Sequence, residues 1–218
     1  MKILVVDIGG RNVKLLATGQ AVARKVPSGP GLTPARMVPA VKKAVADWRY
    51  DAVTIGFPGP VKGGRIAAEP VNLGRGWLRY DFRKAFGRPV RFVNDAAMQA
   101  LGSYRGRREL FLGLGTGLGA ALVVEGIVQP LEIAHLPYRN AKTYEDFLGK
   151  RGLDRAGRKR WRRLVAEIVP RLQHAFQVDE VVLGGGNVKA LKTLPPGCRL
   201  GSNAHAFLGG FRAWEKAR

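Results

Sequence analysis

The residues with the clearest chemical potential are Asn94 and Asp95, where an apolar segment gives way to small residues at helical spacing. A strand that ends in a carboxylate and turns into a helix places that carboxylate at a sheet edge, where ligands bind in open α/β folds. The nearby helix N-terminus favours the ionised aspartate, which can accept a proton from a substrate hydroxyl. The alternative is that both residues only cap the helix.

Glycine-rich segments follow apolar strands at three places: Gly9-Gly10, Gly115-Thr116-Gly117 and Gly184-Gly185-Gly186. The first two stand between two strands, which excludes the Rossmann and P-loop motifs because their glycines open a helix. Backbone N–H groups of a tight turn can still form an anion site, since glycine lets a phosphate approach the main chain. The three segments together predict a site for a phosphorylated ligand.

The elements around these residues occur twice in the same order: strand, glycine turn, strand, short turn, strand. The spacing is nearly the same in both copies, from Asp7 to Gly19 and from Gly115 to Gly126. This internal repeat predicts an α/β fold with two similar lobes and a central cleft. We expect the first lobe over residues 1–106, completed by a helix over 204–218, and the second over 107–203. Expected strands are 2–6, 13–17, 20–26, 52–56, 110–114, 120–124, 127–128 and 180–183, with helices at 34–48, 81–87, 154–177 (bent at Pro170) and from 203.

The composition limits the class of protein. The 218 residues are 46% hydrophobic, enough for a core, and no apolar run has the length of a membrane span. The single cysteine, Cys198, excludes an internal disulfide and a cysteine-rich zinc site. Asp7 interrupts the first apolar run, so no signal peptide is indicated. We therefore expect a cytoplasmic protein that does not enter a membrane.

The net charge is +21, from 37 Lys and Arg against 16 Asp and Glu. A positive field of this size attracts polyanions such as nucleic acids or polyphosphate. Much of the charge is spread evenly along the sequence, however, so the alternative interpretation is a solvated surface with a general basic bias. The densest part is residues 150–163, where eight basic residues face one acid. Trp161 is its only aromatic residue, so a nucleic-acid-binding role is not favoured. In a regular helix Arg155, Lys159 and the pair Arg162-Arg163 would share one face, which predicts a track for a phosphate chain.

The ordered motifs resemble those of the ROK family of sugar kinases, most closely its polyphosphate glucokinase branch. The resemblance covers nearly the whole chain and implies the ribonuclease-H-like actin/hexokinase fold. Each motif alone is weak evidence, whereas the ordered set is specific. The motifs are Asp7-Ile-Gly-Gly10, Gly56-Phe-Pro-Gly59, Val93-Asn-Asp-Ala96, Gly115-Thr-Gly-Leu-Gly119, Glu132-Ile-Ala-His135 and Val182-Leu-Gly-Gly-Gly186.

The resemblance implies an enzyme that transfers a phosphoryl group from polyphosphate or ATP to the 6-hydroxyl of a hexose, with glucose as the expected sugar. Asp95 would be the general base, and Asp7 would hold Mg²⁺ through water. The sugar would be bound by Asn94, Glu132, His135 and Glu145. The donor phosphates would be bound by Asp7, Gly9, Gly10, Arg11, Lys14, Thr116, Gly117, Gly184, Gly185 and Gly186. A homodimer is also expected.

Two residues depart from the family pattern. Arg11 stands where a small or hydroxyl residue is usual, so its cation could bind the donor phosphate or block it. Ala134 replaces the glycine of the Glu-x-Gly-His motif, and for His135 the alternative is a buried structural histidine. The alternative functions are an ATP-dependent kinase for another sugar and a non-catalytic sugar-binding regulator. Regulators of this family have an N-terminal helix-turn-helix, whereas this sequence starts with its first strand, which favours an enzyme.

Overall fold

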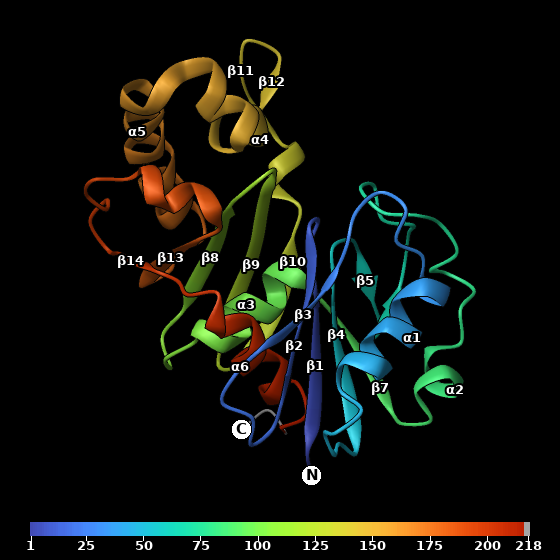
Figure 1. The fold of residues 1–218 in the computed structure, drawn as a ribbon. Helices are drawn as coiled ribbons and strands as arrows, with labels where there is room; N and C mark the ends of the chain where they lie inside the picture. Colours follow the sequence, from blue (N-terminus) through green and yellow to red (C-terminus); the bar gives the residue numbers. More distant parts are fainter. Residues whose placement is uncertain (216–218) are drawn as a thin grey trace. The chain divides into compact units, whose positions relative to one another are not determined.

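The structure is a computed structural model that describes residues 1–215. Its chain forms two compact units, Met1–Met98 with Ala206–Glu215, and Gln99–His205, each built around a five-stranded sheet (Figure 1). The lobe boundaries expected from the sequence stay a prediction. Residues 216–218 of the expected last helix lie outside the described part.

The sheet of the first unit has the strand order β3-β2-β1-β4-β7. The first three strands are antiparallel neighbours, and β1, β4 and β7 run parallel. Every residue of β1 and β4 is buried, as expected for strands covered on both faces. The strand bounds are β1 (Ile3–Ile8), β2 (Asn12–Ala17), β3 (Arg24–Pro27), β4 (Ala52–Phe57) and β7 (Val90–Asn94), with a separate hairpin of β5 (Val61–Lys62) and β6 (Arg65–Ile66).

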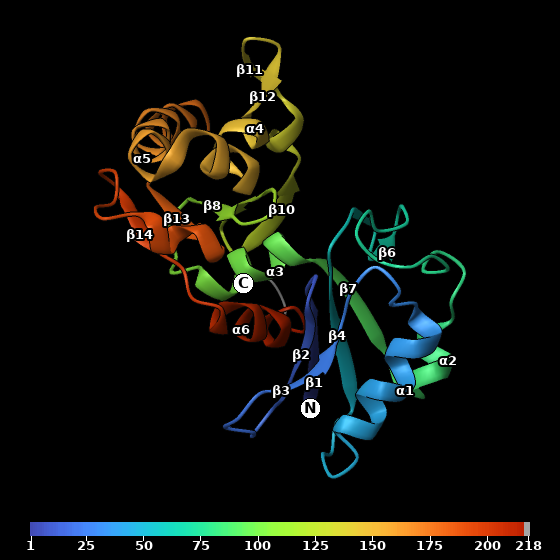
Figure 2. The same cartoon turned by 45° about the horizontal axis from the view of Figure 1, so that its top comes forward.

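Different helices cover the two faces of this sheet (Figure 2). The even-numbered residues of β1 join the core under α1 (Pro34–Ala44) and α2 (Phe82–Phe86). Ile3 and Val5 point to the opposite face and pack with Ala206 and Phe207 of α6 (Ala204–Arg212). The alternation of β1 side chains thus places a core on each side of the strand.

The sheet of the second unit has the order β10-β9-β8-β13-β14. Again three antiparallel strands come first, and β8, β13 and β14 run parallel. The order and directions match those of the first sheet strand by strand, which confirms the internal repeat predicted from the sequence. The strand bounds are β8 (Glu109–Leu114), β9 (Leu118–Val124), β10 (Ile127–Leu131), β13 (Glu180–Gly184) and β14 (Cys198–Leu200).

The long helix α5 (Lys150–Ala175) packs on this second sheet through a buried stripe that includes Trp161, Val165 and Ile168. The indole nitrogen of Trp161 donates to the carbonyl of Leu148 at 3.2 Å, which joins α5 to the short helix before it. The remaining elements are α3 (Asp95–Ser103), η1 (Ile133–His135), β11 (Pro137–Arg139), β12 (Lys142–Thr143), α4 (Tyr144–Leu148) and η2 (Gly186–Ala190). Among the described helices, none combines the length and apolar character that crossing a membrane requires.

The shape of α5 differs from the expectation. The helix begins at Lys150, and its regular path is interrupted at Gly157, where φ is 70° and ψ is 160°. This conformation favours glycine, because a side chain at positive φ is strained. Pro170 lies within the second helical stretch, and the bend expected there stays a prediction. Arg155 and Lys159 lie on opposite sides of Gly157, and the argument that put them on one continuous helical face is wrong.

A buried ionic network joins three parallel strands of the second unit, and nothing in the sequence pattern pointed to it. Glu109 of β8 is completely buried and accepts from the Arg199 guanidinium at 2.7 Å and from the Ser103 hydroxyl. Arg199, on β14, also donates to Glu180 of β13 at 2.9 Å. Burial raises the pKa of Glu109 above its usual value, although Ser103 and Arg199 oppose this shift.

Candidate active site

The parallel strands of the first unit bring Asp7 and the Asn94-Asp95 pair to one edge of the sheet. Asp7 is in register with Gly56 of β4, and Phe57 of β4 is in register with Asn94. Because β4 separates β1 from β7, the ends of the outer two strands are about 10 Å apart. Two carboxylates and an amide therefore lie at the carboxyl edge of parallel strands, where α/β proteins bind ligands.

The start of α3 fixes the side chains of Asn94 and Asp95. Asn94 accepts from the Ala97 N–H at 3.1 Å through Oδ1 and donates to the Gly59 carbonyl at 3.2 Å through Nδ2. Asp95 is the first residue of α3, and its Oδ1 accepts from the Ala96 N–H at 2.8 Å. Asn94 thus caps α3, and its binding of the sugar stays a prediction. The role of Asp95 as a general base stays a prediction.

Gly56 explains how α3 can approach the sheet so closely. A Cβ at this position would lie 2.1 Å from the Met98 Cε atom and 3.6 Å from Asp7 Oδ1. Any side chain here would force the end of the Met98 side chain to move. Glycine at this position therefore leaves room for Met98 of α3 to pack against β4.

Lys14 forms an ion pair with Asp7. The two residues are directly opposite in the antiparallel β1–β2 pair, and Lys14 Nζ lies 3.2 Å from Asp7 Oδ2. Asp7 is buried, whereas Arg11 in the connecting turn is exposed. The turn is closed by the Gly9 N–H, which donates to the carbonyl of Asn12 at 3.0 Å. One hairpin thus holds all the first-unit residues assigned to the donor, namely Asp7, Gly9, Gly10, Arg11 and Lys14.

Asp7 fits Mg²⁺ only as part of a complex with phosphates. Within residues 1–215, no group of three or more His, Cys, Asp or Glu is arranged to hold a metal ion. Mg²⁺ usually keeps several waters and is bound by one or two carboxylates together with substrate phosphates. The one carboxylate assigned to the ion, Asp7, suits an ion that arrives with the phosphate donor.

In the second unit, two glycine segments lie side by side. The Gly115 carbonyl accepts from the Lys150 N–H at 2.9 Å and from Asn187 Nδ2 at 2.8 Å. Asn187 directly follows the third glycine segment, so its amide joins that segment to the turn between β8 and β9. A Cβ on Gly185, whose φ is +84°, would lie 2.4 Å from the Leu114 carbonyl oxygen. Asn187 follows the third glycine segment directly, but only Gly184, Gly185 and Gly186 of this segment were assigned to the donor.

Glu145 has a structural role at the same turn. Its carboxylate accepts from the Leu118 N–H at 3.2 Å and pairs with Arg151 at 3.4 Å. A Cβ on Gly117 would lie 2.5 Å from Glu145 Oε2. A glycine is therefore required at position 117 to leave room for the Glu145 carboxylate. This requirement does not depend on phosphate binding. The sugar contact of Glu145 stays a prediction.

Replacing Gly117 with Ala is expected to reduce stability by about 1–3 kcal/mol, because the new methyl group overlaps the Glu145 carboxylate. Gly115→Ala in the same turn is the matched control, since nothing lies within 4 Å of its added Cβ. Urea denaturation of both variants, alone and with Glu145→Ala, measures the effect. An equal loss for Gly117→Ala in both backgrounds would contradict the proposed overlap.

The pair Glu132 and His135 is exposed. Ile133 and Ala134 are buried and anchor the 3₁₀ turn η1, which leaves Glu132 and His135 with side chains 68% and 74% exposed. The carboxylate and the imidazole lie 3.8 Å apart. The alternative of a buried structural histidine is therefore wrong. The two side chains are brought together in an accessible position, as a sugar-binding pair requires.

The predicted residues fall into two groups, one in each unit. Asp7, the glycine turn after it, Lys14, Asn94 and Asp95 belong to the first unit. Thr116, Gly117, Glu132, His135, Glu145 and Gly184 to Gly186 belong to the second. Their assigned roles, and the central cleft between the lobes, stay predictions.

Residues 3–130 match the family model described as ROK family. The chain belongs to the ROK family. A glucokinase from Pyrobaculum calidifontis is 29% identical over 135 residues, which are 58% of this ROK chain and 45% of the relative. The match thus spans less than half the length of that glucokinase.

Solved structures of related proteins confirm the fold of this ROK chain. An inorganic polyphosphate/ATP-glucomannokinase from Arthrobacter sp. strain KM has a TM-score of 0.79 at 22% identity, over 96% of each chain. A ROK family glucokinase from Streptomyces griseus in complex with glucose and AMPPNP has a TM-score of 0.78 at 16% identity, over 96% of this chain and 98% of the other. The predicted α/β fold of the actin/hexokinase type is therefore confirmed.

Proposed function

We propose that this ROK protein is a hexose kinase that phosphorylates the 6-hydroxyl of a hexose, with glucose as the first candidate. The observation that supports it most is the sheet edge where β1 and β7 end, with Asp7 beside Lys14 and Asp95 beside Asn94. Phosphoryl transfer requires a base for the acceptor hydroxyl and positive charge for the phosphates. This edge offers both within one folding unit.

In the proposed reaction, the sugar hydroxyl oxygen attacks the terminal phosphorus of the donor. A new O–P bond forms while the bond to the leaving phosphate breaks, and the hydroxyl proton passes to the Asp95 carboxylate. Asn94 holds the sugar through hydrogen bonds, and Lys14 neutralises charge on the donor. Mg²⁺ held near Asp7 would supply further charge neutralisation. The backbone N–H groups of the glycine turns bind the phosphates that leave.

For the donor we propose inorganic polyphosphate, ATP or both. The support is the +21 net charge and the similarity in fold to the Arthrobacter polyphosphate/ATP-glucomannokinase, whose name includes both donors.

The KM for a long polyphosphate is expected to rise steeply with salt, because many screened contacts act together, whereas the KM for ATP rises little. Initial rates with each donor at several salt concentrations measure this. Equal salt dependence for both donors would contradict a polyphosphate track on the basic surface.

The proposal is tested by a coupled assay of sugar phosphorylation with ATP and polyphosphate in parallel, over glucose, mannose and other hexoses. Phosphorylation at the 6-position of glucose is the expected result. Phosphorylation of a different sugar with ATP alone would favour the alternative kinase. If the folded protein binds sugar but transfers no phosphate from either donor, it is a non-catalytic regulator. The homodimer and the cytoplasmic location stay predictions.

Glu132→Gln and His135→Ala are each expected to raise the KM for the sugar about tenfold, with a smaller change in kcat. The reason is that each substitution removes a hydrogen bond between a charged or polar side chain and a hydroxyl group of the sugar ring. Discrimination among epimers should fall in parallel. His174→Ala on the exposed part of α5 is the control. Sugar kinetics that stay unchanged in both site variants would show that this pair does not bind the substrate.

A further inference from the structure

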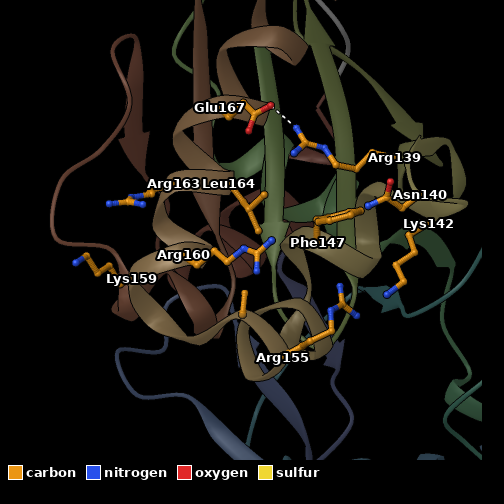
Figure 3. A pocket seen from close by; sticks show the side chains of 11 residues that line it. Arg139, Asn140, Lys142, Phe147, Arg155, Lys159, Arg160, Arg163, Leu164 and Glu167 are labelled. Carbon is orange, nitrogen blue, oxygen red and sulfur yellow. Dashed lines mark hydrogen bonds and ion pairs between the residues drawn. The ribbon is translucent and has the colours of Figure 1, made fainter.

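The second unit has a basic cavity of about 690 Å³ outside the glycine turns (Figure 3). It lies between the β11–β12 hairpin, α4 and α5, and its lining includes none of the residues assigned to the sugar or the donor. Six basic side chains and one acidic side chain line it. The basic residues are Arg139, Lys142, Arg155, Lys159, Arg160 and Arg163, and the acid is Glu167.

The two arginines at opposite ends of the cavity have partners within the unit. Arg139 pairs with Glu167, and Arg155 donates to the carbonyl of Asp146 at 2.5 Å. The other four cations, Lys142, Lys159, Arg160 and Arg163, have no hydrogen-bond or ion-pair partner within residues 1–215. The single acid of the lining is therefore already neutralised by Arg139, and four positive charges are left for a ligand.

The interruption of α5 separates Arg155 from the other α5 cations that line the cavity. Arg155 lies before Gly157, where the helix changes course, and Arg160 lies after it, and both point toward Phe147 (Figure 3). Lys142 of the hairpin lines the same cavity. Lys159 and Arg163 point away from Phe147, along the outer side of α5. They are four residues apart, which is about 6 Å along a helix. The positive charge is thus distributed on both sides of α5 and is not gathered at one point.

We propose that this cavity is an accessory site for an anion with several linked phosphates, either an inorganic oligophosphate or the polyphosphate part of a nucleotide. One orthophosphate carries too little charge, and is too short, to reach Lys142, Arg160 and the pair on the outer side of α5. A chain of linked phosphates satisfies both conditions, since each unit adds a negative charge and length. Phe147 and Leu164 provide an apolar floor for the aliphatic stems of the cations.

The short helix α4 connects this cavity with the glycine turn. Three consecutive residues make the connection: Glu145 accepts from the Leu118 N–H, the Asp146 carbonyl accepts from Arg155, and Phe147 lines the cavity. The accessory site is therefore a neighbour of the turn within the same unit. Its binding of phosphates does not depend on the proposed kinase activity, so the two proposals are tested separately.

Direct binding of tripolyphosphate to the full-length protein tests the proposal, by isothermal titration calorimetry at low salt. The double variant Lys142→Gln, Arg160→Gln removes two cavity cations and is expected to weaken one class of binding at least fivefold. The matched control, Lys192→Gln with Arg158→Gln, makes the same change of charge at two exposed positions outside the lining. The control should bind tripolyphosphate like the unchanged protein, and the melting temperatures of all three proteins should agree.

ATP and tripolyphosphate separate the two sources of the phosphate chain, whereas orthophosphate and single-stranded DNA test the proposal itself. If the cavity variant loses affinity for ATP and for tripolyphosphate equally, the site binds linked phosphates from either source. If it loses affinity for only one of these ligands, the site is assigned to that source. The proposal is overturned if orthophosphate binds as tightly as tripolyphosphate, or if the cavity and control variants lose affinity equally. Binding of single-stranded DNA in the absence of any tripolyphosphate binding would likewise overturn it, in favour of a nucleic-acid surface.

Discussion

Asp95→Asn is expected to lower the rate of phosphoryl transfer by about 10²–10⁴-fold, because the amide cannot accept the proton of the sugar hydroxyl. The substitution keeps an oxygen in the place where Oδ1 accepts from the Ala96 N–H, so α3 should start as before. Sugar affinity should change little. The measurements are kcat in the coupled assay and the Kd for glucose by calorimetry.

Asp81→Asn is the matched control for this prediction. Asp81 caps α2 in the same unit, and its Oδ1 accepts from the Lys84 N–H at 2.9 Å. It makes the same kind of contact away from the carboxyl edge of the sheet, so its variant should keep normal turnover. Near-normal turnover of Asp95→Asn would show that another group accepts the proton.

Arg199→Met is expected to reduce the free energy of unfolding by about 3 kcal/mol at neutral pH. Arg199 is the cation shared by Glu109 and Glu180, and the Glu109 side chain is fully buried. Without it, two carboxylates on neighbouring strands are left close together, one of them in the interior. Urea denaturation followed by circular dichroism measures the loss.

The pH dependence of the free energy of unfolding tests whether the buried charge of Glu109 causes the loss of stability in Arg199→Met. Burial already raises the pKa of Glu109, and removal of Arg199 raises it further. A carboxyl whose pKa is higher in the folded than in the unfolded protein destabilises the fold as the pH rises through the folded value. The deficit of Arg199→Met should therefore be smaller near pH 4 than near pH 8, and Glu109→Gln in the same chain should recover part of it. A deficit independent of pH would indicate lost packing instead.

The sequence predicted the repeat because each copy is specified locally. Short apolar runs followed by glycine turns fix the length of each strand and the point at which it ends, and both sheets follow from them. The start of α3 was predicted for the same reason, since Asn94 caps a helix whose first turn directly follows a strand. Structural features that depend on residues close together in the chain can be predicted from the sequence without knowledge of the tertiary structure.

The tertiary structure alone decided the features that depend on residues far apart in the chain. The buried group of Glu109, Glu180 and Arg199 comes from three separate strands, and no spacing in the sequence joins them. The seat of Glu145 against Gly117 likewise depends on how α4 returns to the β8–β9 turn.

The basic segment of residues 150–163 has one property that the sequence determined and one that only the tertiary structure decided. Its charge was visible in the sequence, but the face it forms was not, because helical periodicity assumes a regular helix. A single positive φ at Gly157 redirects α5, and the hairpin residues Arg139 and Lys142 then join its cations around one cavity. The sequence by itself determined how much positive charge this region has. Only the fold decided which cations face the same ligand, since that depends on where the backbone leaves its regular path.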